Sequence, residues 1–261
     1  MSEAQEQNKA DVKILNEAAA ITNGVQYLCL DIETCHADQA DIDAALAEYM
    51  PPAHYKSQAA IESAREEAFV KIREKSALLD RAPVACVAII TEKNKAVFSC
   101  ILDPVPVSRM PGLDADIFNF KSESEMLLAM REWMDERTNE LTALIGFNIR
   151  SFDLPKLRNA YIRSKIALPN CLLPNVNQIY DVMREYLYNF TTEKAGDRYV
   201  KLSFVQSRFG LPAYKQSISG ADVPDLVRDG KSKIVIPYCF LDTATTYAAF
   251  LYMTGKMPDG K

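Results

Sequence analysis

The chain has 261 residues, 48% of them hydrophobic and 25% charged, so it can bury the core of one large α/β domain or two small ones. No apolar run approaches the roughly 18 residues of a membrane span, and the polar N-terminus does not resemble a signal peptide. We therefore expect a cytoplasmic protein with no membrane partner. The net charge of −5 argues against a protein that coats polyanions, although a basic groove could lie on an acidic body.

The six cysteines form no C-x-x-C pair and lie mostly inside apolar runs. This pattern predicts reduced, buried thiols rather than a disulfide framework or a zinc site.

The first half of the chain predicts a leader, a strand, an insert and a hairpin. Residues 1–25 are polar and alanine-rich, which indicates a loosely ordered or helical leader. We expect the first strand at 27–33 and a polar insert at about 36–82, where apolar spacing predicts one or two helices. Apolar runs at 84–90 and 96–102, joined by the polar turn TEKN, predict a hairpin.

The second half alternates helices and strands. A proline-rich loop at 103–114 precedes a helix whose start is indicated by the capping pair Ser122 and Glu125. A strand at 140–148 and a helix with Pro155 in its first turn follow. The remaining elements are a strand at 177–183 and helices at 201–210, 221–230 and 236–253. This order favours one domain with a mixed sheet flanked by helices.

Two acids follow the apolar part of YLCLDIETC. Asp31 and Glu33 are two positions apart, so in a strand their side chains point to the same face. Like charges at this separation repel each other unless a cation lies between them, and Mg²⁺ or Mn²⁺ prefers such oxygen ligands. The alternative is a strand that runs out into solvent, where the acids are harmless.

Three further residues could join them. Asp153 follows a strand and precedes Pro155, although an aspartate at this position, taken alone, is more often an ordinary helix N-cap. Tyr238 and Asp242 are four apart and share one face of the last helix. Their alternative is a packing tyrosine beside a solvated aspartate.

Together these residues resemble the DEDD 3′–5′ exonucleases of the ribonuclease H-like superfamily. The motif D-x-E is matched by Asp31 and Glu33, N-x(2,3)-F-D by NIRSFD ending at Asp153, and Y-x-x-x-D by Tyr238 and Asp242. The chain most resembles stand-alone predicted exonucleases related to family B DNA polymerases. The resemblance implies a ribonuclease H-like α/β fold with a mixed five-stranded sheet flanked by helices. It covers a domain at 26–254, with the insert at about 36–82, and leaves a tail at 255–261.

The resemblance also implies roles for these residues. Asp31, Glu33 and Asp242 would bind the metal ion that activates water, while Asp31 would bridge to a second ion supported by Asp153. The ions would be Mg²⁺ or Mn²⁺. Tyr238 would orient or help to deprotonate the attacking water. A sister subfamily uses a histidine five residues before the last aspartate, but the two histidines of this chain lie far upstream, which favours the tyrosine (DEDDy) type.

Substrate contacts follow from the same resemblance. Thr34 and the backbone near Ile32 would hold the 3′-terminal nucleotide, and Asn148 and Phe152 would contact the single strand, with a base stacked on Phe152. Core packing is an equal alternative for Phe152. Scattered basic residues, including Lys201, receive no role, because a solvated surface explains them as well.

The expected activity is hydrolysis of phosphodiester bonds at the 3′ end of single-stranded DNA, with release of nucleoside monophosphates. A polymerase or another replication or repair protein could be a partner in trans. The alternatives are an exoribonuclease of the ribonuclease D kind and a catalytically silent single-strand-binding module of the same fold. A glycosidase with two acids is a further alternative, but such enzymes give no reason for the third motif.

Overall fold

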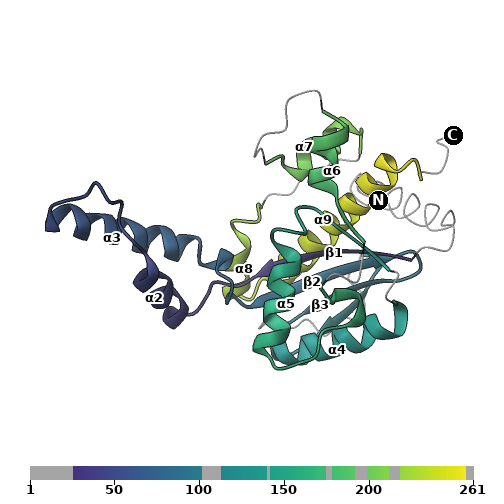
Figure 1. The fold of residues 1–261 in the computed structure, drawn as a ribbon. Coiled ribbons are helices and arrows are strands. Elements are labelled where there is room, and N and C mark those ends of the chain that lie inside the picture. Colours follow the sequence, from purple (N-terminus) through teal and green to yellow (C-terminus); the bar gives the residue numbers. More distant parts are fainter. Residues whose placement is uncertain are drawn as a thin grey trace.

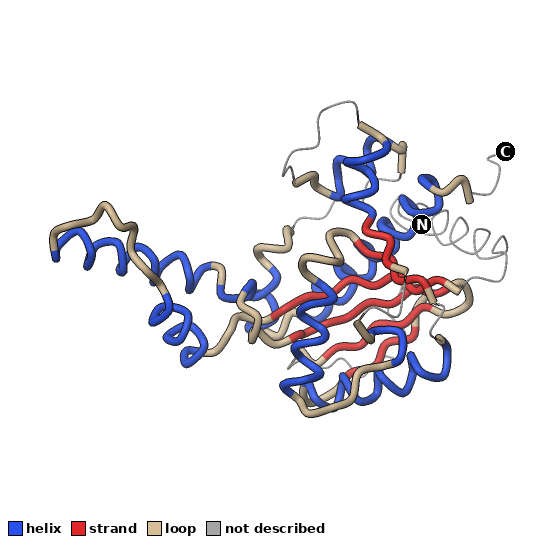
Figure 2. Tube along the Cα trace, viewed as in Figure 1, coloured by secondary structure: helices blue, strands red, loops and turns tan. Residues whose placement is uncertain are grey.

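The computed structural model describes residues 26–101, 113–139, 142–174, 178–191, 199–211 and 218–256. Within these ranges a six-stranded sheet has helices on both faces (Figures 1 and 2). The predicted leader at 1–25 and residues 257–261 of the predicted tail lie outside the described residues, as does most of the proline-rich loop at 103–114.

The sheet has the strand order β4-β3-β2-β1-β5-β6. β1 is antiparallel to β2 and parallel to β5, and β2 is antiparallel to β3. β4 pairs parallel with β3, and β6 pairs parallel with β5. The strands are β1 (Tyr27–Thr34), β2 (Val84–Thr91), β3 (Lys95–Ser99), β4 (Asp116–Asn119), β5 (Ala143–Gly146) and β6 (Ile179–Asp181). The strand that carries the first two acids is therefore central.

The alternation of β1 divides the core into two layers. Leu28, Leu30 and Ile32 pack on one face of the sheet with α4 (Glu123–Arg137) and α5 (Asp153–Arg163). Cys29, two residues before Asp31, packs on the other face with α9 (Ser232–Met253). As the sequence predicts, the odd positions of β1 share a face, and this face is covered by α9.

The long helix α9 is apolar and long enough to cross a membrane by length and composition, so the expectation that no apolar run approaches the length of a membrane span is wrong for it; however, 67% of its most apolar stretch is buried. It lies across β1, β2 and β5 (Figure 1). Its apolar composition is thus explained by packing inside the fold. Smaller helices α6 (Val182–Asn189), α7 (Leu202–Arg208) and α8 (Val223–Arg228) also contact it.

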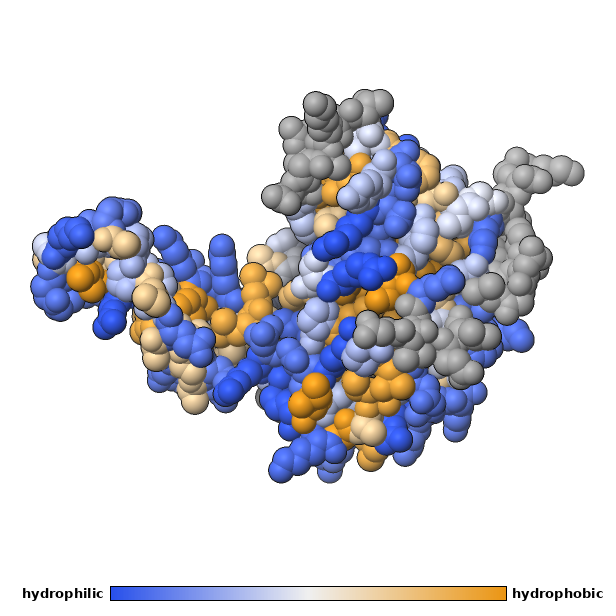
Figure 3. Space-filling view, viewed as in Figure 1, coloured by the Kyte–Doolittle hydropathy of each residue, from blue (hydrophilic) through white to orange (hydrophobic). Residues whose placement is uncertain are grey.

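The predicted insert at 36–82 forms two α-helices, α2 (Gln39–Glu48) and α3 (Gln58–Glu74), followed by the 3₁₀ turn η2 (Ser76–Leu78). α2 and α3 form an arm that projects from the sheet (Figure 1), and hydrophilic residues dominate its visible surface (Figure 3). A small apolar cluster that includes Ile42, Phe69 and Ile72 lies at its base. The arm therefore has little core of its own.

The structure corrects several boundaries. The sheet has six strands rather than five, because the short strand β4 pairs along β3. The strand expected at 177–183 ends at Asp181, whose side chain caps α6 by accepting a hydrogen bond from the Arg184 N–H. The helix expected at 236–253 begins earlier, at Ser232. η3 (Asn170–Leu172) is a further 3₁₀ turn.

Two local predictions are confirmed. Ser122 caps α4 by accepting a hydrogen bond from the Glu125 N–H, 3.2 Å away. None of the six cysteines, all of which lie in the described residues, forms a disulfide, and Cys29, Cys86, Cys171 and Cys239 are buried.

Candidate active site

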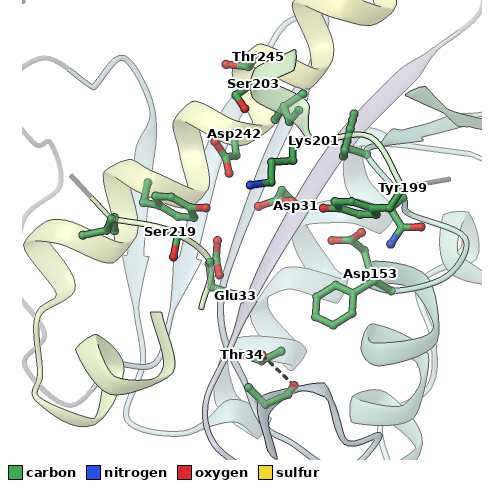
Figure 4. Close-up of a pocket in the computed structure, with 18 of the residues that line it drawn as sticks. Asp31, Glu33, Thr34, Asp153, Tyr199, Lys201, Ser203, Ser219, Asp242 and Thr245 are labelled. Atoms are coloured by element: carbon green, nitrogen blue, oxygen red, sulfur yellow. Dashed lines mark hydrogen bonds between the residues drawn. The ribbon is translucent and has the colours of Figure 1, made fainter. Parts of the chain in front are cut away.

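Four carboxylates and a tyrosine from distant parts of the chain line one cavity of about 710 Å³. Asp31 and Glu33 come from β1, Asp153 from the start of α5, and Tyr238 and Asp242 from α9. Figure 4 shows the four carboxylates pointing toward one another across this cavity. The three sequence motifs therefore meet in space.

Asp31 and Glu33 are held close together without compensating positive charge on the strand. Glu33 is 8% exposed, and the ligand atoms of Asp31, Glu33 and Cys239 all lie within 4.8 Å of one another. Burial, followed by the charges of Asp153, Glu33 and Asp242, raises the pKa of Asp31 well above its usual value. Burial and Asp242 likewise raise the pKa of Glu33. The alternative of a strand running into solvent is excluded for Glu33, because this side chain is buried.

Asp153 is not the cap of its own helix. It is the first residue of α5, which has no side-chain cap, and its carboxylate Oδ1 accepts a hydrogen bond from the Ile32 N–H, 3.2 Å away. β5 pairs with β1 only as far as Cys29, so Ile32 lies beyond the end of that ladder. Burial raises the pKa of Asp153 to about 7, even though hydrogen bonds from its own backbone N–H and from the Ile32 N–H lower it.

Tyr238 and Asp242 lie one helical turn apart and are joined by a side-chain hydrogen bond. Burial, followed by the charges of Asp242 and Glu33, raises the pKa of Tyr238. The hydroxyl oxygen lies 3.6 Å from the position that a Cβ at Gly220 would occupy. Tyr238 therefore keeps its proton near neutral pH, and the loop at Gly220 passes close to its hydroxyl group.

The turn before Asp153 is organised by a buried acid that the sequence analysis missed. Asp181 is 1% exposed, and its carboxylate accepts hydrogen bonds from the Asn148 N–H (3.1 Å) and the Arg150 N–H (3.2 Å). A Cβ at Gly146 would lie 2.7 Å from Ile149, so the tight turn requires glycine there. The sequence signal for Asp181 was its position directly before a helix, but the strand predicted at 177–183 included this residue.

The four residues expected to contact substrate have different positions. Thr34, Asn148 and Phe152 line the cavity, whereas Ile32 is 3% exposed and contributes its backbone N–H to Asp153. Asn148 adopts a positive φ of 59° at the turn. Phe152 is half-buried: it packs against the core and also lines the cavity, so a base stacked on this ring stays a prediction.

Two further residues face the acids. Lys201 and Tyr199 line the same cavity and point toward the carboxylates in Figure 4. Burial and the charges of Asp242, Asp31 and Asp153 raise the pKa of Tyr199. The sequence offered no spacing that distinguished either residue from the solvated surface, because their position depends on the chain path before α7.

The donor set fits hard divalent cations. It consists of carboxylate oxygens crowded at a partly buried place, where their mutual repulsion favours either protonation or a bound cation. The Cys239 thiol donates a hydrogen bond to the Asp31 carbonyl oxygen at 3.5 Å, so Cys239 also lies next to the carboxylates.

A comparison with family models agrees with this geometry. The model described as a predicted 3′–5′ exonuclease related to the exonuclease domain of PolB matches residues 112–258, more than half of the chain. The matched segment contains Asp153, Tyr238 and Asp242, and the fold brings Asp31 and Glu33 to them from outside it. The search of curated proteins finds no match.

Proposed function

Because the chain belongs to the predicted 3′–5′ exonucleases related to the exonuclease domain of PolB, we propose that it removes nucleoside monophosphates from the 3′ end of single-stranded DNA. The observation that carries this proposal is the convergence of Asp31, Glu33, Asp153 and Asp242 with Tyr238 around one cavity. The relation to the exonuclease domain of PolB supports DNA as the preferred substrate.

The carboxylates divide into two overlapping sets. Asp31, Glu33 and Asp242 would hold one divalent ion, and Asp31 and Asp153 would hold a second. When bound, two Mg²⁺ or Mn²⁺ ions supply an activated water and stabilisation of the leaving 3′ oxygen. The backbone N–H of Ile32 keeps the Asp153 carboxylate oriented toward the cavity.

The remaining polar groups would position the reactants. Tyr238 keeps its proton, and its hydroxyl group can hold the attacking water by a hydrogen bond while Asp242 fixes the phenol. The Lys201 ammonium points toward the carboxylates (Figure 4), where it can contact a phosphate oxygen of a nucleotide with any base. A polymerase or repair protein could deliver the 3′ end in trans.

The test is digestion of matched DNA and RNA oligonucleotides labelled at the 5′ end, single- and double-stranded, with Mg²⁺, Mn²⁺ or EDTA. We expect a ladder that shortens from the 3′ end of single-stranded DNA and requires the metal. Faster digestion of RNA would assign the activity to an exoribonuclease of the ribonuclease D kind. Binding without digestion under every condition would indicate a silent single-strand-binding module.

A further inference from the structure

Five aromatic rings form a continuous group where α6, α7 and the end of α9 meet, outside the active-site cavity. This group, called the aromatic strip below, consists of Tyr186, Phe190, Phe204, Phe209 and Tyr252. The ring centroids are 6.1 Å apart between Phe204 and Tyr186 and 6.4 Å apart between Tyr186 and Phe190. They are 5.7 Å apart between Phe190 and Phe209 and 6.0 Å apart between Phe209 and Tyr252. Each ring therefore contacts the next one.

Two of these rings pack the helices together, and the other three face solvent. Tyr186 is 4% exposed and Phe209 is half-buried, so both fill the space between α6, α7 and α9. Phe204, Phe190 and Tyr252 are 47%, 43% and 40% exposed. Apolar side chains that are exposed singly need no explanation, whereas a contiguous group of them marks a binding surface. Helix packing thus explains only part of the aromatic strip.

Positive charge accompanies the exposed rings. The Arg208 guanidinium carbon lies 5.6 Å from the centroid of the Phe204 ring, and Arg208 is itself exposed. Lys201 precedes the other end of α7, and α7 contains no acidic residue. Glu185, the acid of α6, accepts a hydrogen bond from the Asn189 side chain, 3.0 Å away. Aromatic rings next to arginine and lysine match a ligand that has flat apolar groups and negative charges.

The helix α7 connects the aromatic strip to the active site. Lys201, Ser203 and Gln206 line the cavity, whereas Phe204 and Arg208 are exposed residues that do not line it. The two helices that carry most of the strip, α6 and α7, lie together at the top of Figure 1 and touch through the Tyr186 and Phe204 rings. One side of α7 therefore faces the cavity, and another side carries the strip.

A single strand is the ligand that fits both sides of α7. The cavity of about 710 Å³ is of the size that encloses a small ligand, so a longer strand with its 3′ end at the carboxylates must leave the cavity over one of its walls. Unpaired bases stack on exposed aromatic rings, and their phosphates bind cations, whereas a duplex hides the faces of its bases. The wall formed by α7 offers both kinds of contact.

We propose that the aromatic strip is an exosite that binds the unpaired nucleotides upstream of the 3′ end, by stacking of their bases on its exposed rings. Arg208 contacts the backbone phosphates beside Phe204. This proposal rests on the proposed function for the position of the 3′ end. It makes affinity depend on strand length, because only a strand that extends beyond the cavity reaches the strip. Stacking reads no pattern of donors and acceptors, so the exosite accepts all four bases.

The test combines a change of strand with a change of protein. Three 5′-labelled single-stranded DNA oligonucleotides are compared: one of about 4 nucleotides, one of about 12, and one of about 12 in which all but the last few residues at the 3′ end are abasic. The two long strands have the same phosphates, so their difference reports the bases alone. Fluorescence anisotropy measures the dissociation constants, with Ca²⁺ in place of Mg²⁺ to limit hydrolysis, and gels verify that the strands stay intact.

The protein change replaces one exposed ring. Phe204→Leu keeps an apolar side chain but removes the flat face, and Phe204→Trp keeps a flat face. Tyr55→Leu is the matched control, because Tyr55 is an aromatic residue of the arm with similar exposure (38%) and does not line the active-site cavity. Melting curves verify that each variant is folded.

For the wild type, we expect the intact long strand to bind at least about tenfold more tightly than the abasic long strand. Phe204→Leu should bind the intact long strand about five- to tenfold more weakly than the wild type does and the other two strands equally well. Phe204→Trp and Tyr55→Leu should match the wild type on all three. Arg208→Gln, a change of an exposed side chain, should lower the salt dependence of binding for the long strands and leave that of the short strand unchanged.

Three results would overturn the exosite. They are equal wild-type affinity for the two long strands, a loss in Phe204→Leu that is as large on the short strand as on the long one, and no loss in that variant. The last result would leave the exposed rings as a surface for a protein partner. Digestion of the same strands with Mg²⁺ is a separate reading. If the binding differences appear but no nucleotide is released, the proposed activity is wrong and the exosite stands.

Discussion

The Asp153 carboxylate accepts a hydrogen bond from the Ile32 N–H across 121 positions of the chain. This contact links the start of α5 to the strand that carries Asp31 and Glu33. Because Ile32 lies between Asp31 and Glu33 on β1, this hydrogen bond holds the Asp153 carboxylate close to both acids. A helix-capping aspartate would instead precede the helix and accept hydrogen bonds from the N–H groups two or three residues further along it.

The first prediction concerns Asp153. An asparagine keeps an oxygen that can accept from the Ile32 N–H but removes the charge, so Asp153→Asn should not lower the melting temperature. Its digestion rate should fall about 100- to 1,000-fold, as when one electrostatic group of an active site is removed. Asp153→Ala should also lose stability, by about 1–3 kcal/mol, because a buried N–H is left unpaired. Melting curves and end-labelled digestion measure the two effects, and equal stability of both variants would contradict the role of the hydrogen bond.

The second prediction separates stability from activity at Asp31. Burial and neighbouring acids raise the pKa of Asp31, so its charged form opposes folding at neutral pH in the absence of metal. Asp31→Asn should therefore abolish digestion and raise the melting temperature in EDTA by about 2–4 °C, the shift that about 1 kcal/mol produces in a protein of this size. Asp43→Asn, a change of an exposed acid on the arm, is the control and should alter neither.

Metal titration completes this test. Mn²⁺ should raise the melting temperature of the wild type, because a ligand of the folded state stabilises it, and should affect Asp31→Asn much less. An equal rise in both proteins would place the metal outside the candidate site.

The third prediction concerns Tyr238. Tyr238→Phe keeps the ring but removes the hydroxyl group that would hold the attacking water. We expect kcat to fall about 10- to 100-fold while KM changes little. This loss is smaller than the one usually seen when a general acid or base is removed. Steady-state digestion of a fluorescent single strand measures both constants. A rise in KM with unchanged kcat would instead assign Tyr238 to substrate binding.

The fourth prediction concerns the buried Lys156, which binds the backbone of residues 77–79. Lys156→Met removes the donor to the Ala77 and Leu79 carbonyl oxygens, so the free energy of unfolding should fall by about 1–3 kcal/mol. Chemical denaturation measures this loss. Lys165→Met, a change of an exposed lysine two residues past α5, is the control and should have a small effect.

The same pair of proteins gives a pH dependence. Burial lowers the pKa of Lys156 to about 8, below its value in the unfolded chain. The unfolded state therefore binds more protons between pH 8 and about 10.4, and the stability that Lys156 contributes should rise with pH across this window. The difference in unfolding free energy between the wild type and Lys156→Met should grow from pH 7 to pH 10. A difference that shrinks would contradict the lowered pKa.

The fifth prediction concerns Lys201. If its ammonium group contacts a phosphate, Lys201→Gln should weaken binding of single-stranded DNA equally for all sequences. The slope of the logarithm of affinity against the logarithm of salt concentration should decrease by about 1. Lys233→Gln, a change of an exposed lysine that does not line the cavity, should leave the slope unchanged. An unchanged slope in Lys201→Gln would exclude the phosphate contact.

The sequence by itself determined the local geometry of the acids. The two-residue period of a strand placed Asp31 and Glu33 on one face, and the helical period placed Tyr238 beside Asp242. The cap at Ser122 could also be predicted from the sequence, because a cap and the N–H group that it binds lie within a few residues of each other. All of these relationships span four residues or fewer.

The tertiary structure alone decided the relationships between distant segments. Asp153 bonds to β1 because β5 ends early, and Asp181 accepts from the Asn148 N–H because β6 lies beside β5. Leu78 reaches the cavity because Thr34 and Lys156 both bind the Ala77 carbonyl oxygen. Each contact depends on where one strand or helix ends relative to another. Local periodicity carries no information about these ends, since they are set by packing over the whole core.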